Sequence, residues 1–177
     1  DPRRTQIVER ERGELTTRDL LPDEDVMVII SRDGYVRRQA LDKRPAAGRG
    51  KSVVQYLLST NTRHNLALFT ADGQALPLPV HCIPEGEGTD KGASLTDLCS
   101  LDRGQRVSVL LSLPHEEAQG YLLTATRGGK IKRTALDEFV SALARGAVAV
   151  MTVDKGDELT WARLTDGKQE VILVSRR

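Results

Sequence analysis

The sequence has few of the residues from which catalytic and metal sites are built. Its 177 residues include three histidines and two cysteines, and aromatic side chains make up 3% of the chain. His64, His81 and His115 lie far apart without a ligand spacing such as H-E-x-x-H, and Cys82 and Cys99 form no C-x-x-C pair. The carboxylates cluster in turns, where aspartate stabilises the backbone. We therefore predict no catalytic residues, no metal site and no cofactor in this chain.

Long apolar runs are also missing, and we expect no secretory leader. No apolar run approaches the roughly 20 residues that are needed to cross a bilayer. A single pair of cysteines without a leader is typical of reduced thiols in a reducing compartment. We expect a soluble, cytoplasmic protein with structural thiols and no membrane partner.

Net charge is nearly absent, but the charges are unevenly placed. The chain has 26 Lys and Arg against 25 Asp and Glu. Residues 31–52 hold seven of these cations and only two acids, whereas residues 1–25 hold five cations and eight acids. A basic segment on a nearly neutral molecule indicates a localised anionic partner better than the total charge does.

A turn that follows an apolar run recurs along the chain. The turns lie at 31–34 (SRDG), 70–73 (TADG) and 126–129 (TRGG), and the final residues VILVSRR repeat the approach to such a turn. An internal period of roughly 40–55 residues is the signature of a repeat architecture. We expect blades at about 26–64, 65–119 and 120–168, the start of another at 169–177, and a charged junction at 1–25.

Each unit contains enough short strands for one four-stranded sheet. After the turn comes a second strand, an irregular stretch ending in a basic residue and glycine (49–50, 91–92 and 145–146), and further strands. Four-stranded sheets that stack radially bury their faces, as in propellers. The prediction is an all-β fold with about three blades of a larger propeller-like ring. We expect one solvated face on 35–40, an edge strand at Pro77 and Pro79, and a short helix at 136–144.

One motif resembles a phosphate-binding loop. Gly50-Lys51-Ser52 matches the end of G-x-x-x-x-G-K-[ST], but Pro45 stands where the first glycine belongs, and no helical pattern follows Ser52. We do not expect nucleotide binding here.

The basic segments of the first and third units predict contacts with phosphates. Cations at equivalent positions of successive blades can follow a phosphate backbone along one rim. With so few aromatic residues to stack on unpaired bases, duplex DNA is favoured over single strands. Between residues 65 and 95, the second unit has Lys91 as its only cation. Any DNA path along the rim must therefore be supported unevenly. The alternative interpretation is that these cations belong to a solvated strand face and contact no DNA. The predicted contacts are Arg37, Arg38, Lys43, Arg44, Arg49, Lys51, Arg127, Lys130, Lys132, Arg133 and Arg145.

Three stretches carry a family resemblance. EDVMVIISRDGYVRR (24–38), GYLLTATRGGKIKRTALDEF (120–139) and GDELTWARLTDGKQEVILVS (156–175) resemble the C-terminal domain of the A subunit of DNA gyrase, a type IIA topoisomerase. The resemblance implies a partial β-pinwheel whose rim binds and wraps duplex DNA. It also implies an upstream breakage-reunion core in the same subunit, a gyrase B subunit in an A2B2 holoenzyme, and ATP and Mg²⁺ for that holoenzyme.

The resemblance also assigns a DNA-contacting loop. The family's gyrase box, Q-R-R-G-G-K-G, falls on residues 44–50, where Gly48 and Gly50 match and Arg49 keeps the lysine's charge. Pro45, Ala46 and Ala47 depart from the pattern. Because the box is half eroded, the A subunit of topoisomerase IV, which unlinks DNA, is an alternative to gyrase. A propeller that binds proteins and no DNA is a third possibility.

Overall fold

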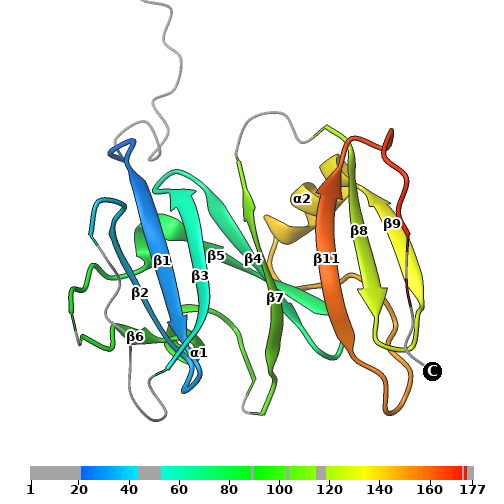
Figure 1. The fold of residues 1–177 in the computed structure, drawn as a ribbon, viewed down its shortest axis with the longest axis horizontal. Coiled ribbons are helices and arrows are strands. Elements are labelled where there is room, and N and C mark those ends of the chain that lie inside the picture. Colours follow the sequence, from blue (N-terminus) through cyan, green and yellow to red (C-terminus); the bar gives the residue numbers. More distant parts are fainter. Residues whose placement is uncertain are drawn as a thin grey trace, which may run out of the picture.

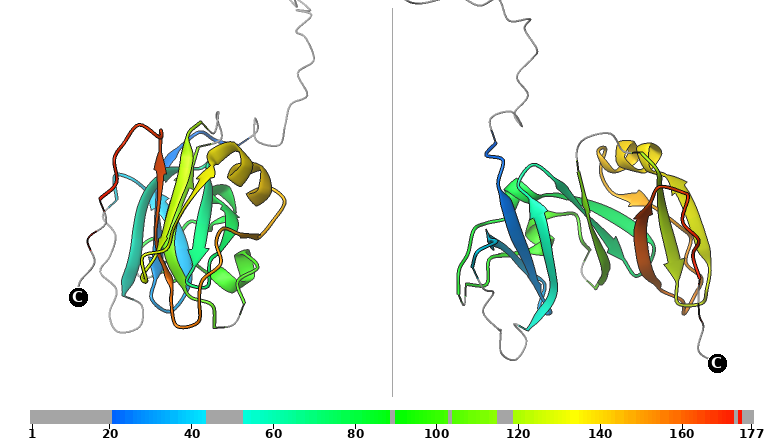
Figure 2. Two further views of the ribbon diagram at one scale, coloured as in Figure 1. Left: turned by 90° about the vertical axis from the view of Figure 1, so that its right-hand side faces the viewer. Right: turned by 45° about the horizontal axis from the view of Figure 1, so that its top comes forward.

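The computed structural model consists of three antiparallel β-sheets that stand side by side in chain order (Figures 1 and 2). It describes residues 21–43, 53–88, 90–102, 104–114, 119–172 and 174. The predicted all-β, propeller-like fold is confirmed. The first sheet contains β1 (Asp25–Ser31), β2 (Tyr35–Ala40), β3 (Val54–Asn61) and β6 (Ala93–Ser94). The second contains β4 (Asn65–Thr70), β5 (Gln74–Pro79), β7 (Val107–Leu113) and β10 (Val148–Ala149), and the third contains β8 (Tyr121–Thr126), β9 (Ile131–Ala135) and β11 (Leu159–Thr165).

Each sheet is built on a hairpin that closes at a predicted glycine turn. Gly34, Gly73 and Gly129 have φ angles of 82°, 91° and 89°, a backbone conformation that glycine adopts without strain. Next to each turn, the hydroxyl of Ser31, Thr70 or Thr126 accepts a hydrogen bond from the N–H four residues later, over 3.3, 3.1 and 3.2 Å. The repeated bond confirms the three hairpins and fixes which positions of the repeats are equivalent.

The short fourth strand of a sheet comes from the following repeat. β6 lies in the second repeat but pairs with β2 of the first sheet, and β10 lies in the third repeat but pairs with β5 of the second sheet. The order in the first sheet is therefore β3-β1-β2-β6, and in the second β10-β5-β4-β7. Among the described residues, β9 pairs only with β8 and is therefore an edge strand of the third sheet.

Two hydrophobic cores fill the spaces between neighbouring sheets. The first joins Val28 and Ile30 of β1 to Leu66 and Leu68 of β4. The second joins Phe69 of β4 to the third sheet and to α2 (Leu136–Leu143), whose Phe139 ring stacks on the Phe69 ring with centroids 5.8 Å apart. The second sheet is therefore buried on both faces. A four-residue helix, α1 (Leu95–Leu98), and the 3₁₀ turn η3 (Val80–Cys82) complete the described elements.

Two details differ from the sequence predictions, while the helix at 136–144 is confirmed. β5 is not an edge strand, because β10 pairs with Gln74 and Ala75; Pro77 and Pro79 lie beyond that two-residue contact and need no partner for their missing N–H. The predicted solvated face of β2 is also wrong, since Arg37 and Gln39 are 6% and 5% exposed. The chain at Gly92 passes so close that a β-carbon there would lie 2.8 Å from the Arg37 Cβ.

Candidate nucleic-acid interface

The most basic element of the described structure is the β8–β9 hairpin. Residues 121–135 contain Arg127, Lys130, Lys132 and Arg133 and no acidic residue. Lys132 and Arg133 are exposed on β9, the open edge of the third sheet. The Arg133 guanidinium lies over the Tyr121 ring, 4.5 Å from its centroid, and the Lys132 ammonium donates to the Val150 carbonyl over 2.6 Å. These contacts hold two cations on one exposed strand.

A neighbouring acidic loop partly neutralises the tip of this hairpin. The Glu158 carboxylate accepts a hydrogen bond from the Arg106 guanidinium over 2.6 Å and lies 3.9 Å from the Arg127 guanidinium. The Asp154 carboxylate pairs with the Lys130 ammonium over 3.0 Å. The cations and Asp154 are exposed and Glu158 is partly exposed, and at such positions an ion pair contributes between about zero and 1 kcal/mol. The carboxylates therefore reduce the local positive potential without locking the cations in place.

The same loop also caps the hairpin turn, because one of its side chains accepts a backbone N–H of the turn. Asp157 accepts the Gly128 N–H over 2.7 Å. The pKa of Asp157 lies below its usual value, chiefly because the Thr126 hydroxyl bonds to the carboxylate. The N–H groups of Glu158 and Gly128 and the nearby Arg127 also lower this pKa. Asp157 therefore stays ionised at neutral pH. Around this cap is an open hollow of about 570 Å³, lined by Arg127, Gly128, Gly129, Lys130, Asp154, Lys155, Gly156 and Asp157.

Two of the predicted cations of the first repeat are turned toward the protein, and a third is paired with an acid. Arg37 is buried, with one guanidinium nitrogen lacking a hydrogen-bond partner. Arg38, whose side chain is 16% exposed, donates to the Ile83 carbonyl over 2.8 Å and pairs with Glu85 over 3.0 Å. Lys43 pairs with Glu87, and this hydrogen bond raises the pKa of Lys43. The expected exposure of Arg37 and Arg38 is wrong, because distant acids and the Gly92 segment cover them.

The remaining predicted positions divide into two sets. Arg145 is exposed just after α2. The predicted box residues Arg44, Gly48, Arg49, Gly50 and Lys51 lie outside the described residues. Contact with DNA stays a prediction for all of these, and for the cations of the β8–β9 hairpin.

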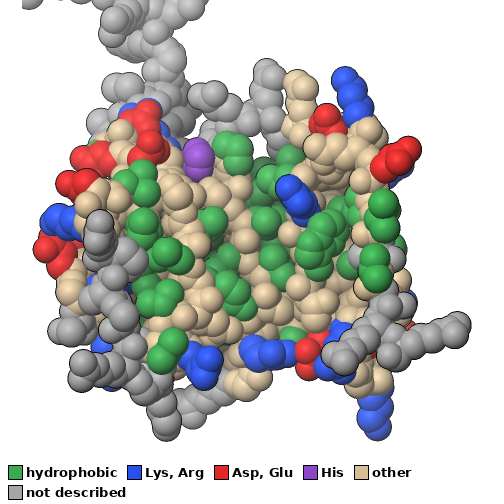
Figure 3. Space-filling model, in the orientation of Figure 1, with side chains coloured by type: hydrophobic (Ala, Val, Ile, Leu, Met, Phe, Trp, Pro, Cys, Tyr) green, Lys and Arg blue, Asp and Glu red, His purple; other side chains and the backbone are tan. Residues whose placement is uncertain are grey.

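Sequence reasoning missed three cations at the edge where the hairpin turns lie. Arg32 is in the first turn, while Arg106 and Lys155 belong to the loops that lead into β7 and β11. Figure 3 shows Lys and Arg side chains gathered along this lower edge, with Asp and Glu gathered over the first sheet at the upper left. The recurrent D-x-G turns at 102–104 and 154–156 marked these loops. A comparison of turn positions between repeats would have found them.

Other kinds of site find no support in the part of the chain that the structure describes. No group of three or more His, Cys, Asp or Glu side chains there is placed to hold a metal ion. None of the described helices is both long and apolar enough to cross a membrane.

Comparison with known proteins supports the same family. Residues 120–166 match the family described as DNA gyrase C-terminal domain, beta-propeller. The chain is 31% identical over 188 residues to the A subunit of DNA gyrase from Nocardioides sp., with 100% of this chain and 20% of the relative covered. It is 33% identical over 186 residues to the A subunit of DNA gyrase from Escherichia coli (strain K12), with 99% and 21% covered. The resemblance to the C-terminal domain of the gyrase A subunit is confirmed.

Solved structures agree with this assignment. The C-terminal domain of DNA topoisomerase IV superposes with a TM-score of 0.68 at 28% identity, covering 83% of this chain and 47% of that structure. A DNA gyrase A C-terminal domain superposes with a TM-score of 0.60 at 20% identity, covering 78% and 47%, and so supports the fold. The chain thus spans about a fifth of the curated gyrase relatives and about half of each of these two solved domains.

Proposed function

We propose that this chain binds and wraps duplex DNA as the C-terminal domain of a DNA gyrase A subunit. The observation that carries the proposal is the β8–β9 hairpin, which presents four cations and no acid and ends in an exposed edge strand. Each phosphate that these cations neutralise releases counterions and adds affinity independent of base sequence. No catalytic role is assigned to the chain itself.

The uneven charge of the sheets predicts where the duplex is held. The second hairpin, residues 65–79, has no cation and contains Asp72, whereas the third hairpin carries a charge of +4. The cations Arg32, Arg106 and Lys155 extend the positive edge between the hairpin turns. Wrapping requires contacts at several points, because added backbone contacts must offset the free energy of bending DNA. The third sheet is the primary anchor in this proposal.

The rest of the enzyme is part of the same proposal. The breakage-reunion core of the same subunit would make the DNA break, and a gyrase B subunit in an A2B2 assembly would use ATP and Mg²⁺ to drive negative supercoiling. The place of action would be the bacterial cytoplasm, at the nucleoid. An A subunit of topoisomerase IV is the second candidate, favoured by the TM-score of 0.68 to that enzyme's C-terminal domain. Topology assays on the holoenzyme separate the two, since only gyrase introduces negative supercoils.

Binding of a fluorescent 40-base-pair duplex at increasing salt tests the proposal. We expect affinity to fall steeply with salt, and the double variant Lys132→Ala/Arg133→Ala to lower the slope of log K against log salt by about two. Lys91→Ala is the matched control, since Lys91 also lies over a tyrosine ring, that of Tyr35, but in the first sheet. Absence of duplex binding at low salt would overturn the proposal and favour a protein-binding propeller.

A further inference from the structure

In the second and third sheets, the hairpin turn is bonded to the loop that leads into β7 or β11. The Ala71 N–H donates to the Arg106 carbonyl over 2.9 Å, and the Arg127 N–H donates to the Glu158 carbonyl over 2.8 Å. Ala71 and Arg127 occupy equivalent positions in their turns, so Arg106 and Glu158 are equivalent as well. The two contacts between turn and loop can therefore be compared residue by residue.

The side-chain contact beside this backbone bond is reversed between the two sheets. In the second sheet the turn supplies the carboxylate, because Asp72 accepts a hydrogen bond from the Gln105 amide over 3.0 Å. In the third sheet the loop supplies it, because Asp157 accepts the Gly128 N–H over 2.7 Å. Asp72 and Gly128 lie at equivalent turn positions. Each sheet thus has one carboxylate and one donor between turn and loop, with the two roles exchanged.

The space at each contact explains why the residues occur in these pairs. A β-carbon at Gly128 would lie 2.8 Å from the Asp157 Oδ2 atom, closer than a β-carbon approaches such an atom in folded proteins. Moving Asp157 away would break two bonds, since its Oδ1 accepts the N–H groups of Gly128 and Glu158 over 2.7 and 2.8 Å. An aspartate in the loop therefore favours glycine in the turn. Where the turn has Asp72, the longer and neutral Gln105 fits instead.

Both loops carry a cation close to the residue that holds them. Arg106 follows Gln105 directly, and Lys155 lies two residues before Asp157. Both cations are exposed at the edge of the hairpin turns, where Lys and Arg side chains gather (Figure 3). The second hairpin, residues 65–79, has no cation of its own, so its turn depends on the loop for positive charge. A bond that holds the loop on the turn also holds the cation at this edge.

We propose that Gln105 and Asp157 are positioning residues for the duplex, which hold the cation-bearing loops of the second and third sheets on the hairpin turns. This inference rests on the proposed binding of duplex DNA. An ordered loop presents its cation to a phosphate without further loss of conformational freedom. A free loop must be ordered on binding, and this cost lowers the affinity. Gln105 carries no charge, so its replacement tests positioning separately from electrostatic attraction.

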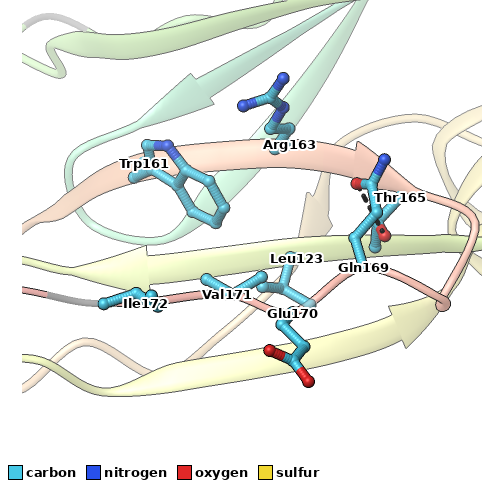
Figure 4. Close-up of a pocket in the computed structure, with 8 residues that line it drawn as sticks. All are labelled: Leu123, Trp161, Arg163, Thr165, Gln169, Glu170, Val171 and Ile172. Atoms are coloured by element: carbon cyan, nitrogen blue, oxygen red, sulfur yellow. Dashed lines mark hydrogen bonds between the residues drawn. The ribbon is translucent and has the colours of Figure 1, made fainter.

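Replacement of Gln105 by alanine tests this role in the 177-residue chain. We expect Gln105→Ala to raise the Kd for the fluorescent duplex about two- to tenfold, the cost of ordering mobile groups on binding. The slope of log K against log salt should not change, because no cation is removed. Gln169→Ala is the matched control, since Gln169 accepts a hydrogen bond from the Thr165 hydroxyl, at the other end of the third sheet from its hairpin turn (Figure 4). This variant should bind like the parent chain.

An exchange of the pair provides a second test. Asp72→Gly/Gln105→Asp gives the second sheet the residues that the third has at these positions, and it leaves the net charge unchanged. The introduced aspartate should accept the N–H of the introduced glycine, so we expect the Kd to match that of the parent. Gln105→Asp alone should bind more weakly than the double variant, because its carboxylate would face the carboxylate of Asp72.

Urea unfolding and circular dichroism separate this role from a purely structural one. If Gln105→Ala loses stability but keeps the duplex Kd of the parent, the contact only stabilises the fold and the proposal is overturned. A folded double variant that binds no better than Gln105→Asp would overturn it too. Failure of the parent chain to bind duplex is a different result, since it would overturn the proposed function and the positioning role with it.

Discussion

Val150 donates its backbone N–H to the carbonyl oxygen of Gly73 over 2.9 Å. This bond fastens a segment of the third repeat onto the turn of the second hairpin. Leu95 donates in the same way to Gly34, also over 2.9 Å, between the second and first repeats. The turn glycines therefore serve two purposes, since they close the hairpins and receive the strands that complete the sheets.

Alanine at Gly73 should be more damaging than alanine at Gly34. Both residues have positive φ, so each substitution carries left-handed backbone strain of about 1 kcal/mol. A β-carbon at Gly73 would also overlap the Met151 carbonyl oxygen, whereas a β-carbon at Gly34 meets nothing within 4 Å. Overpacking adds about 1–3 kcal/mol. Urea unfolding should therefore give a lower free energy of unfolding for Gly73→Ala than for Gly34→Ala. An equal decrease in the two variants would show that the contact at Met151 relaxes freely.

Removal of the Glu158 charge should strengthen duplex binding. Glu158 is close to both Arg106 and Arg127, so its carboxylate competes with DNA phosphate for these two arginines. We expect Glu158→Gln to lower the Kd for duplex several-fold at low salt, with the difference shrinking as salt screens the charges. Glu85→Gln is the control, because Glu85 pairs with Arg38 in the first sheet. If both variants bind alike, competition at the hairpin tip plays no part.

Acid should destabilise the protein partly through Asp157. Its pKa is lowered in the folded state, so its contribution to the free energy of unfolding is fully present above the unfolded value, near 3.9, and disappears as pH falls through the folded pKa. Asp157→Asn should thus reduce stability at neutral pH, and its difference from the parent should shrink as pH falls through the folded pKa. Urea midpoints measured at several pH values check this prediction. If the stability difference between Asp157→Asn and the parent chain persists undiminished in acid, the loss of stability comes from packing and not from the charge of Asp157.

The two cysteines should react at different rates. Cys82 is exposed, whereas Cys99 is partly buried and donates its thiol hydrogen to the Leu95 carbonyl over 3.0 Å. Burial raises the pKa of Cys99, and since the thiolate is the reactive form, its alkylation is slowed. In a time course with iodoacetamide followed by mass spectrometry, Cys82 should be modified first. Unfolding in urea should remove the difference, and equal rates in the folded protein would contradict the prediction.

The sequence predicted local structure better than it predicted which strands pair between repeats. The turns at Gly34, Gly73 and Gly129 follow from residue types within four positions, and so do the hairpins that they close. The exchange of β6 and β10 did not follow, because a two-residue strand carries too little pattern to reveal its partner. The error on β5 arose from this gap, since its partner β10 lies some 70 residues further along the chain.

The exposure of the predicted cations agrees with the charge pattern of the sequence in one repeat and departs from it in another. Residues 121–135 contain no acid, and the cations of β9 are exposed in space. Arg127 and Lys130 of the same hairpin are paired with Glu158 and Asp154. Arg38 and Lys43 also look unopposed locally, but Glu85 and Glu87 reach them from the next repeat. Charge patterning along a chain counts neighbours in sequence, whereas electrostatic potential depends on neighbours in space.

The exchange of short strands means that a folding unit does not coincide with a repeat of the sequence. During synthesis, the first sheet gains its last strand only after residue 94 has left the ribosome, and the second only after residue 149. The first and second sheets each depend on the following repeat, so a break in the chain between repeats would leave the preceding sheet with an unpaired edge strand. Loss of one repeat would therefore weaken its predecessor as well, and the domain should melt in fewer steps than its number of sheets.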